Sequence, residues 1–191
     1  RSVTLLRECL DPMTTPLIYP LTPEHASAYR ALRLRCLTDH PEAFTSDAQE
    51  AHTQPLDWSI MRLTPHPDRP HDFFLGAWVN GELVGMVGLQ GRYRTKERHN
   101  ATVLGMYVAP QHTSQGLGAL LLTALLEQAR QRPELEQLDL TVTQGNHTAQ
   151  ALYARHGFTV FGVHPNAIKV HDQYYAKVLM SLDLRANAQG G

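Results

Sequence analysis

A glycine-bearing turn near the middle of the chain has the residue types of an anion-binding site. Polar residues 111–115 follow a buried apolar run and lead into Gly116 and Gly118, after which leucines recur at helical spacing. Glycine lets a ligand approach the backbone, and the first turn of a helix exposes unpaired N–H groups with a partial positive charge. The sequence therefore predicts that this turn binds an anion, most often a phosphate. Ser114 is the expected N-cap of the helix.

Three generic explanations compete for the glycine pair. A Walker P-loop requires GxxxxGK[ST], and neither the lysine nor the hydroxyl residue follows either glycine. A dinucleotide fingerprint requires GxGxxG directly after a strand, but Leu121 occupies the third glycine position and seven residues separate Val108 from Gly116. The third explanation, a loop that only turns the chain, is not excluded, because a GxG pair alone is a weak signal.

Asn146 and Tyr153 form a second pair of residues that could do chemistry. They lie seven residues apart in a predicted helix, so both fall on one helical face, two turns apart. An asparagine at a helix start also serves as an N-cap, and a tyrosine also fills a seam between helix and sheet. A phenol of pKa about 10 can protonate a departing thiolate, whose pKa is about 8.5 or higher in a dry cleft.

The elements that position these residues alternate along the chain. Helices are expected at residues 22–39, 47–63 (interrupted by Pro55), 117–129 and 146–157, and Asn80-Gly81 predicts a hairpin turn. Residues 64–71 and 164–172 are expected to be loops. The fold class is therefore mixed α/β, a central mixed sheet flanked by helices on both faces, with about seven strands at residues 17–21, 73–79, 83–90, 103–108, 138–143, 158–163 and 174–184.

Composition argues against several classes of protein. The net charge is −1 with both signs mixed, which argues against nucleic-acid or membrane-surface partners, and no apolar run approaches the roughly 20 residues of a membrane span. Cys9 and Cys36 predict no disulfide framework, and the eleven histidines show no metal-binding spacing, so no metal and a cytoplasmic location are expected. Residues 1–12 are expected to be a leader or expression-derived tail, and residues 13–191 a single domain.

Two segments in order give the chain a family resemblance. The run MYVAPQHTSQGLGALLL resembles motif A of the GNAT N-acetyltransferase superfamily, whose pattern is approximately [Q/R]xxGxG/A after a strand. The run VTQGNHTAQALYARHGF resembles the second signature, an asparagine that opens a helix, a tyrosine seven residues on, and a glycine–aromatic pair. RALRLRCLTDHPEAFTSD and YYAKVLMSLDL look like the corresponding ends of such enzymes, so the resemblance spans about residues 17–184.

The resemblance implies a cofactor site. It implies that acetyl-CoA binds in a V-shaped split between the fourth and fifth strands, with its pyrophosphate on backbone amides. Its pantetheine would pair with the fourth strand, where Gly105 is the expected bulge. Thr113 occupies the place of the usual Gln or Arg, and Tyr153 would be the general acid. The implied cofactor-binding residues are Met106, Tyr107, Val108, Thr113, Ser114, Gln115, Gly116, Leu117, Gly118, Ala119 and Asn146.

The sequence says less about the residues that bind the acceptor than about those that bind the cofactor. The resemblance implies an amine acceptor near Phe44, His99 and Tyr175. The family's usual glutamate on the fourth strand is Thr102 here, so the general base stays open between His99, Glu82 and a water chain. The basic loop at residues 92–98 could steer an acidic acceptor or the cofactor, or be a solvated hairpin.

The expected activity is transfer of an acetyl group from acetyl-CoA to a primary amine by direct attack in a ternary complex. Neither cysteine falls in a motif, so an acyl-cysteine route is disfavoured. An acyl-CoA-binding module that senses the cofactor without transferring it is the alternative. Either a monomer or a homodimer is compatible with the sequence.

Overall fold

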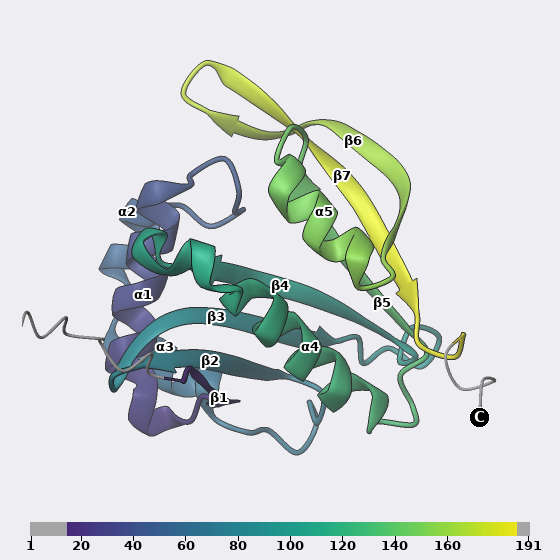
Figure 1. Cartoon of the computed structure of the whole chain (residues 1–191), viewed down its shortest axis with the longest axis horizontal. Coiled ribbons are helices and arrows are strands. Elements are labelled where there is room, and N and C mark those ends of the chain that lie inside the picture. The colour runs from purple at the N-terminus through teal and green to yellow at the C-terminus, as the bar shows by residue number, and fades with distance from the viewer. Residues whose placement is uncertain (1–14, 187–191) are drawn as a thin grey trace, which may run out of the picture.

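The computed structural model describes residues 15–186 (Figure 1). The predicted leader at residues 1–12 lies outside these described residues, as do residues 187–191. The helical elements are η1 (Pro23–His25), α1 (Ala26–Asp39), α2 (Ala48–Thr53), α3 (Leu56–Leu63), η2 (Pro110–Gln115), α4 (Leu117–Arg130) and α5 (His147–Arg155). The strands are β1 (Leu17–Pro20), β2 (Phe73–Val79), β3 (Glu82–Gly91), β4 (Asn100–Val108), β5 (Gln137–Thr143), β6 (Thr159–Val170) and β7 (Gln173–Asp183).

The seven strands form one mixed sheet in the order β1-β2-β3-β4-β5-β7-β6. All neighbours are antiparallel except β4 and β5, which run parallel and pair only at residues 100–102 and 137–139. Figure 1 shows the two strands side by side at the end where β5 begins and diverging from there. The predicted split between the fourth and fifth strands is confirmed.

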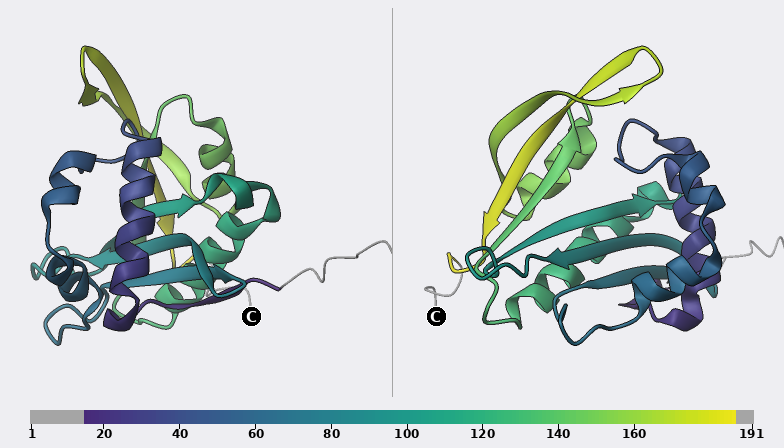
Figure 2. Two further views of the ribbon diagram at one scale, coloured as in Figure 1. Left: turned by 90° about the vertical axis from the view of Figure 1, so that its left-hand side faces the viewer. Right: turned by 180° about the vertical axis from the view of Figure 1, so that it is seen from behind.

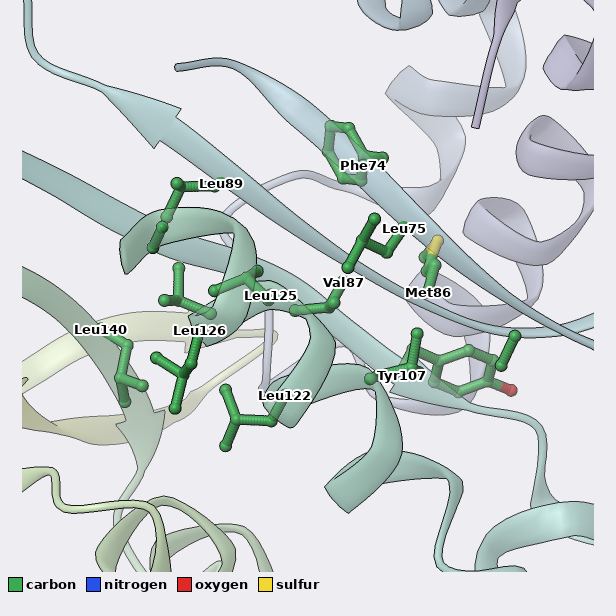
Figure 3. Packing of buried hydrophobic residues seen from close by; sticks show 14 of the residues in the cluster. Phe74, Leu75, Met86, Val87, Leu89, Tyr107, Leu122, Leu125, Leu126 and Leu140 are labelled. Carbon is green, nitrogen blue, oxygen red and sulfur yellow. The ribbon is translucent and has the colours of Figure 1, made fainter. Parts of the chain in front are cut away.

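Helices cover both faces of the sheet, as predicted. Figure 2 shows α3 and α4 on opposite sides of the strands. Tyr29 of α1 packs edge-on against Phe74 on one face, with ring centroids 5.2 Å apart. On the other face, α4 turns Leu122, Leu125 and Leu126 towards the strands (Figure 3), and all three leucines are buried. The apolar spacing of α4 therefore supplies buried leucines to the core on that face.

Two glycines in β3 allow neighbouring side chains to pack closely against the strand. A Cβ at Gly85 would lie 3.1 Å from Leu121 of α4, and one at Gly88 would lie 2.5 Å from the Phe74 ring. At the β2–β3 turn, Asn80 and Gly81 have φ of 52° and 79°, which is the left-handed geometry of a tight hairpin. The hairpin turn predicted at Asn80-Gly81 is confirmed.

Of two predicted segments, one agrees with the structure and one differs. The interruption expected at Pro55 in residues 47–63 is present, because Gln54 and Pro55 have extended backbones that separate α2 from α3, and Pro55 is the N-cap of α3. The loop expected at residues 164–172 is wrong, because β6 continues to Val170 and only His171 and Asp172 make the turn to β7. β6 is an edge strand, where the register shift between His164 and Ile168 accommodates Pro165.

Candidate active site

The β4 strand has a backbone edge that faces the split. Within residues 15–186, no strand pairs with β4 beyond Thr102 on the β5 side. On the β3 side the register shifts from Met86–Tyr107 to Gly88–Leu104, which leaves Gly105 in a bulge with φ of 66°. The predicted bulge is therefore confirmed. An extended ligand could hydrogen-bond to this free edge as an added strand would.

The turn at residues 110–119, which the sequence predicts to bind an anion, is called the anion-binding turn below. The helix that follows it begins at a different residue from the one expected. Residues 110–115 form the 3₁₀ helix η2, and α4 begins at Leu117 with Gly116 as its N-cap. The predicted cap at Ser114 is wrong, because Ser114 lies inside η2 and the left-handed φ of Gly116, 71°, makes the turn between the two helices. Leu120 donates its amide to the carbonyl of Gly116, so the amides of residues 117–119 lie in the first turn, without a helical acceptor.

The side chains in the turn leave the space in front of these amides open. A Cβ at Gly116 would meet no atom within 4 Å. Thr113 folds back and donates from Oγ1 to the carbonyl of Pro110 at 3.0 Å, and Gln115 pairs through Oε1 with Nδ1 of His112 at 3.0 Å. The turn therefore presents backbone donors with no cationic side chain from Thr113 or Gln115.

Asn146 and Tyr153 lie on the helix next to that turn. Asn146 is the N-cap of α5, and its Oδ1 accepts from the amide of Ala149 at 3.1 Å, which leaves its side-chain N–H groups free to donate to a ligand. Leu152 lies 3.3 Å from where a Cβ of Gly118 would be, so α5 packs directly on the start of α4. This contact brings the segment that carries Tyr153 beside the anion-binding turn.

Tyr153 is a buried phenol, with 7% of its surface exposed. Its ring packs edge-on against Phe158 at 5.9 Å, and its hydroxyl has no hydrogen-bond partner within the described part of the chain. Burial raises the pKa of Tyr153 to about 12. The phenol therefore keeps its proton at neutral pH and has it available to donate.

The predicted cofactor residues of β4 lie along the edge beyond the bulge. Met106 and Val108 are half-buried, whereas Tyr107 is buried and donates its hydroxyl to Oδ2 of Asp39 at 2.8 Å. Burial and the neighbouring Asp39 carboxylate raise the pKa of Tyr107. The Tyr107 side chain thus fixes β4 to the end of α1, and only its backbone is available to a ligand in the split.

The predicted acceptor residues do not all lie together. Phe44, in the loop after α1, is half-buried against the core, and Tyr175 lies on β7, where its hydroxyl donates to Gln173 at 2.9 Å. His99 lies just before β4, exposed, at the end where β4 and β5 still pair. Six residues of extended chain, roughly 20 Å, separate His99 from the Gly105 bulge. The structure therefore brings Phe44 and Tyr175 to the open end of the split and leaves His99 at the closed end.

A buried lysine ties the two halves of the sheet at the open end. Lys177 of β7 donates from Nζ to the carbonyls of Glu42 and Ala43, at 3.2 and 2.7 Å, and to Oγ1 of Thr143 at 3.0 Å. Thr143 donates in turn to the Glu42 carbonyl at 3.1 Å. Burial lowers the pKa of Lys177. The loop at residues 40–46 is thus fixed to the far ends of β5 and β7, and it places Phe44 beside the strand that carries Tyr175.

A carboxylate that sequence reasoning missed lies next to Thr102. Asp139 of β5 pairs in register with Thr102, accepts its Oγ1 hydrogen bond at 2.6 Å, and forms an ion pair with Arg92. Glu82, by contrast, is exposed at the β2–β3 turn. The Leu-Asp-Leu-Thr alternation of β5 could have indicated that Asp139 leaves the core face, but the partner strand and register are tertiary properties. A carboxylate is therefore present on β5, directly beside the β4 position that Thr102 occupies.

The donors in the split fit a CoA-like ligand. First-turn amides and an open approach at Gly116 suit a pyrophosphate, and the free β4 edge suits an amide-bearing chain. Tyr153 lies on the neighbouring helix α5. Among the described residues, no group of three or more His, Cys, Asp or Glu side chains is arranged to hold a metal ion. Nor is any helix in this part of the chain both long and apolar enough to cross a membrane.

Comparison with known families decides the classification. The family described as "Acetyltransferase (GNAT) family" matches residues 34–158, a segment that includes β4, the anion-binding turn, Asn146 and Tyr153. The chain belongs to the GNAT acetyltransferase family. Members of this family use acetyl-CoA, and the matched segment contains the amides, the β4 edge and the phenol described above.

Curated relatives of this GNAT chain are acetyltransferases. It is 28% identical over 181 residues to the mycothiol acetyltransferase of Salinispora arenicola, covering 87% of this chain and 55% of that protein. The chain thus spans about half the length of the mycothiol enzymes that it matches. It is 25% identical over 138 residues to the L-amino acid N-acetyltransferase AaaT of Escherichia coli, covering 72% of this chain and 82% of the relative.

Solved structures share the GNAT fold of this chain. A GNAT acetyltransferase from Streptococcus pneumoniae superposes with a TM-score of 0.80 at 24% identity, covering 87% of this chain and 98% of that one. The acetyltransferase yncA from Salmonella typhimurium, solved with acetyl-CoA, superposes with a TM-score of 0.72 at 21% identity, covering 90% and 95%. At these identities the likeness establishes the fold.

Proposed function

We propose that this chain is an acetyl-CoA-dependent N-acetyltransferase that transfers the acetyl group to a primary amine by direct attack in a ternary complex. The observation that carries the proposal is the contact of Leu152 with Gly118, which joins the helix of Tyr153 to the anion-binding turn. The name of the AaaT relative, an L-amino acid N-acetyltransferase, supports an amine as acceptor.

The backbone does most of the binding in this proposal. The amides of residues 115–119 hold the pyrophosphate, the free N–H groups of Asn146 and the β4 edge at Met106 and Val108 hold the pantetheine, and Gly105 opens that edge. Bound acetyl-CoA supplies the thioester carbonyl as electrophile. Because backbone donors are rigid, they orient the thioester at little cost in conformational entropy.

Tyr153 is the proton donor. Its pKa of about 12 keeps the phenol protonated, and the same burial that raises this pKa raises that of a departing thiolate. The proton therefore moves from the phenol oxygen of Tyr153 to the leaving sulfur as the C–S bond breaks. The attacking nitrogen loses its extra proton to solvent as the amide forms, and solvent returns a proton to Tyr153.

Asp139 accepts the proton of the acceptor ammonium through water. An alkylammonium has a pKa near 10 and must lose a proton before its nitrogen can attack. Asp139 lies at the point where β4 and β5 separate, its side chain is 18% exposed, and Thr102 and Arg92 fix both of its oxygens. Its position supports this role better than the exposed, distant His99 and Glu82.

No cysteine of the described chain is placed for an acyl-enzyme intermediate. Cys36 is buried in α1, and burial raises the pKa of its thiol to about 12. A thiol is nucleophilic only as the thiolate, which burial disfavours. Direct attack by the amine is the route that the described residues support.

The test combines cofactor binding with turnover. Calorimetry should show that CoA binds the wild type and Tyr153→Phe equally, whereas thiol release from acetyl-CoA with an amine panel should fall about 10²-fold or more in the variant. Tyr19→Phe, remote on β1, is the matched control and should keep full turnover. Absence of CoA binding, or an unchanged rate in Tyr153→Phe, would contradict the proposal.

A further inference from the structure

A cavity of about 540 Å³ lies on the sheet face that α1–α3 cover. Its floor is apolar, with Phe73 and Phe74 of β2 and Leu104 of β4, and α3 supplies Trp58 and Arg62 to its wall. This size is in the range of small-molecule sites. The space is therefore large enough for a small acceptor with a functional group at each end.

Arg62 presents a cation to this cavity without a carboxylate partner. Its guanidinium lies 5.2 Å from the Trp58 ring and 5.1 Å from the Phe74 ring, and its Nε donates to the hydroxyl of Tyr29 at 3.0 Å. Within the described residues, no acidic side chain forms an ion pair with Arg62. The aromatic rings and the Tyr29 hydroxyl hold the guanidinium in place while its two terminal nitrogens stay free to donate.

The other charged groups in the cavity wall reinforce this positive end. Arg69, from the loop at residues 64–71, also lines the cavity. None of its side-chain nitrogens forms an ion pair with an acidic side chain among residues 15–186. The carboxylate in the wall is Asp72, and its Oδ1 already accepts from the Gly91 amide at 2.8 Å and from the Tyr93 hydroxyl at 2.7 Å. The cavity thus offers two guanidinium groups against one carboxylate that is already engaged.

The opposite wall of the cavity borders the split. Leu104 immediately precedes the bulged Gly105, and Gln90 pairs in register with Thr102, whose hydroxyl binds Asp139. Residues two apart on β4 share a face, so Thr102 lies on the same face as Leu104. The cavity therefore has a cationic end at α3 and reaches, at its β4 wall, the place where β4 turns its free edge to the split.

We propose that this cavity binds an amine acceptor that carries a carboxylate, with the carboxylate on Arg62 and Arg69 and the amine at the Leu104 wall. A guanidinium recognises a carboxylate with two parallel hydrogen bonds, so one end of the acceptor is fixed. The ammonium then points towards the split and the Asp139 side. This assignment rests on the proposed function, since it names the acceptor for the same reaction.

The experiment compares acceptors that differ only in the carboxylate. The twenty L-amino acids and their carboxamides are assayed for CoA release from acetyl-CoA with wild type, Arg62→Gln, Arg62→Lys and Arg69→Gln. In the wild type, kcat/KM for the preferred amino acid should exceed that for its carboxamide by about tenfold or more. Arg62→Gln should reduce that preference to near one by raising KM, and Arg69→Gln should reduce it in part.

Controls separate this proposal from the function that it deepens. Arg130→Gln, at an exposed residue at the end of α4, should keep the wild-type preference for the carboxylate. Arg62→Lys keeps the charge but cannot form the two parallel hydrogen bonds of a guanidinium, so it should retain part of that preference. CoA binding by calorimetry should be the same in all variants. Equal use of carboxamides, a preference that survives in both Arg62→Gln and Arg69→Gln, or no turnover with any amino acid would overturn the carboxylate assignment. If CoA fails to bind, the proposed function itself fails.

Discussion

Thr102 of β4 donates a hydrogen bond from Oγ1 to Oδ1 of Asp139 on β5, at 2.6 Å, across the last pair of residues that joins the two strands. Arg92 holds the other carboxylate oxygen. A hydroxyl on one strand thus positions an acid on the next, at the apex of the split. Asp139 thus lies beside Thr102, the β4 position at which the resembled family usually has a glutamate.

Replacement of Asp139 by Asn should reduce turnover while cofactor binding stays intact. Loss of the proton acceptor is expected to lower kcat by about 10²-fold or more. Steady-state kcat and CoA calorimetry measure turnover and cofactor binding. Asp139→Glu should restore part of the rate. A rate unchanged in Asp139→Asn would assign Asp139 to structure alone.

Tyr153 should make the protein less stable at high pH. Its pKa is about 12 in the folded chain and about 10 when unfolded, so the folded state binds the proton more tightly and its stabilisation is complete below pH 10. The free energy of unfolding should fall by about 1 kcal/mol between pH 9 and pH 11 through this group alone. Urea unfolding of wild type and Tyr153→Phe measures it: the difference between the two proteins must change with pH over this range. A constant difference would contradict the buried, protonated phenol.

Arginine at position 113 should strengthen cofactor binding. Thr113 contributes no charge to the turn, and its hydroxyl bonds to its own 3₁₀ helix. A charge-assisted hydrogen bond to a phosphate should add about 1–2 kcal/mol, which is roughly a 5- to 30-fold lower Kd for CoA. Calorimetry at low and high salt measures the gain, which salt should diminish. Thr113→Gln is the uncharged control, and equal affinities in both variants would show that the turn does not face the phosphates.

Loss of the Lys177 ammonium should release the loop at residues 40–46. Lys177→Met keeps the apolar stem but removes three hydrogen bonds, which should cost about 1–3 kcal/mol of stability and expose the amides around Phe44. Urea unfolding and hydrogen exchange of residues 40–46 measure both. Lys169→Met, exposed on the neighbouring strand, is the control. If exchange in the loop were unchanged, another contact would fix it.

Local patterns predicted the elements on which the cofactor site depends. The leucine spacing of α4, the Asn80-Gly81 turn and the Gly105 bulge are encoded by neighbouring residues, so the sequence indicated them directly. The start of α4 was misplaced at Ser114, because a serine before a glycine has the same composition whether it caps a helix or lies in a 3₁₀ turn. That helix boundary depends on the backbone angle of Gly116.

The positions of the residues proposed to bind the acceptor depend on contacts between segments far apart in the sequence, which no local pattern contains. Asp139 meets Thr102 only because β4 and β5 are parallel in one particular register, and Lys177 reaches the loop after α1 across 134 positions of sequence. Arg62 was not singled out, since a lone arginine in an amphipathic helix normally faces solvent. Its position over two aromatic rings follows from the packing of α3 on β2.

Trp58 lies between two guanidinium groups, with Arg33 at 5.1 Å and Arg62 at 5.2 Å from its ring, and it lines the cavity. The chain contains one other tryptophan, Trp78, which is stacked on Tyr19 of β1 at 5.3 Å. An acceptor that draws Arg62 towards its carboxylate changes the electric field at the Trp58 indole, so its emission should shift in wavelength or intensity. Trp58→Phe would identify the responding indole, which makes the protein's own fluorescence a label-free titration signal for acceptors.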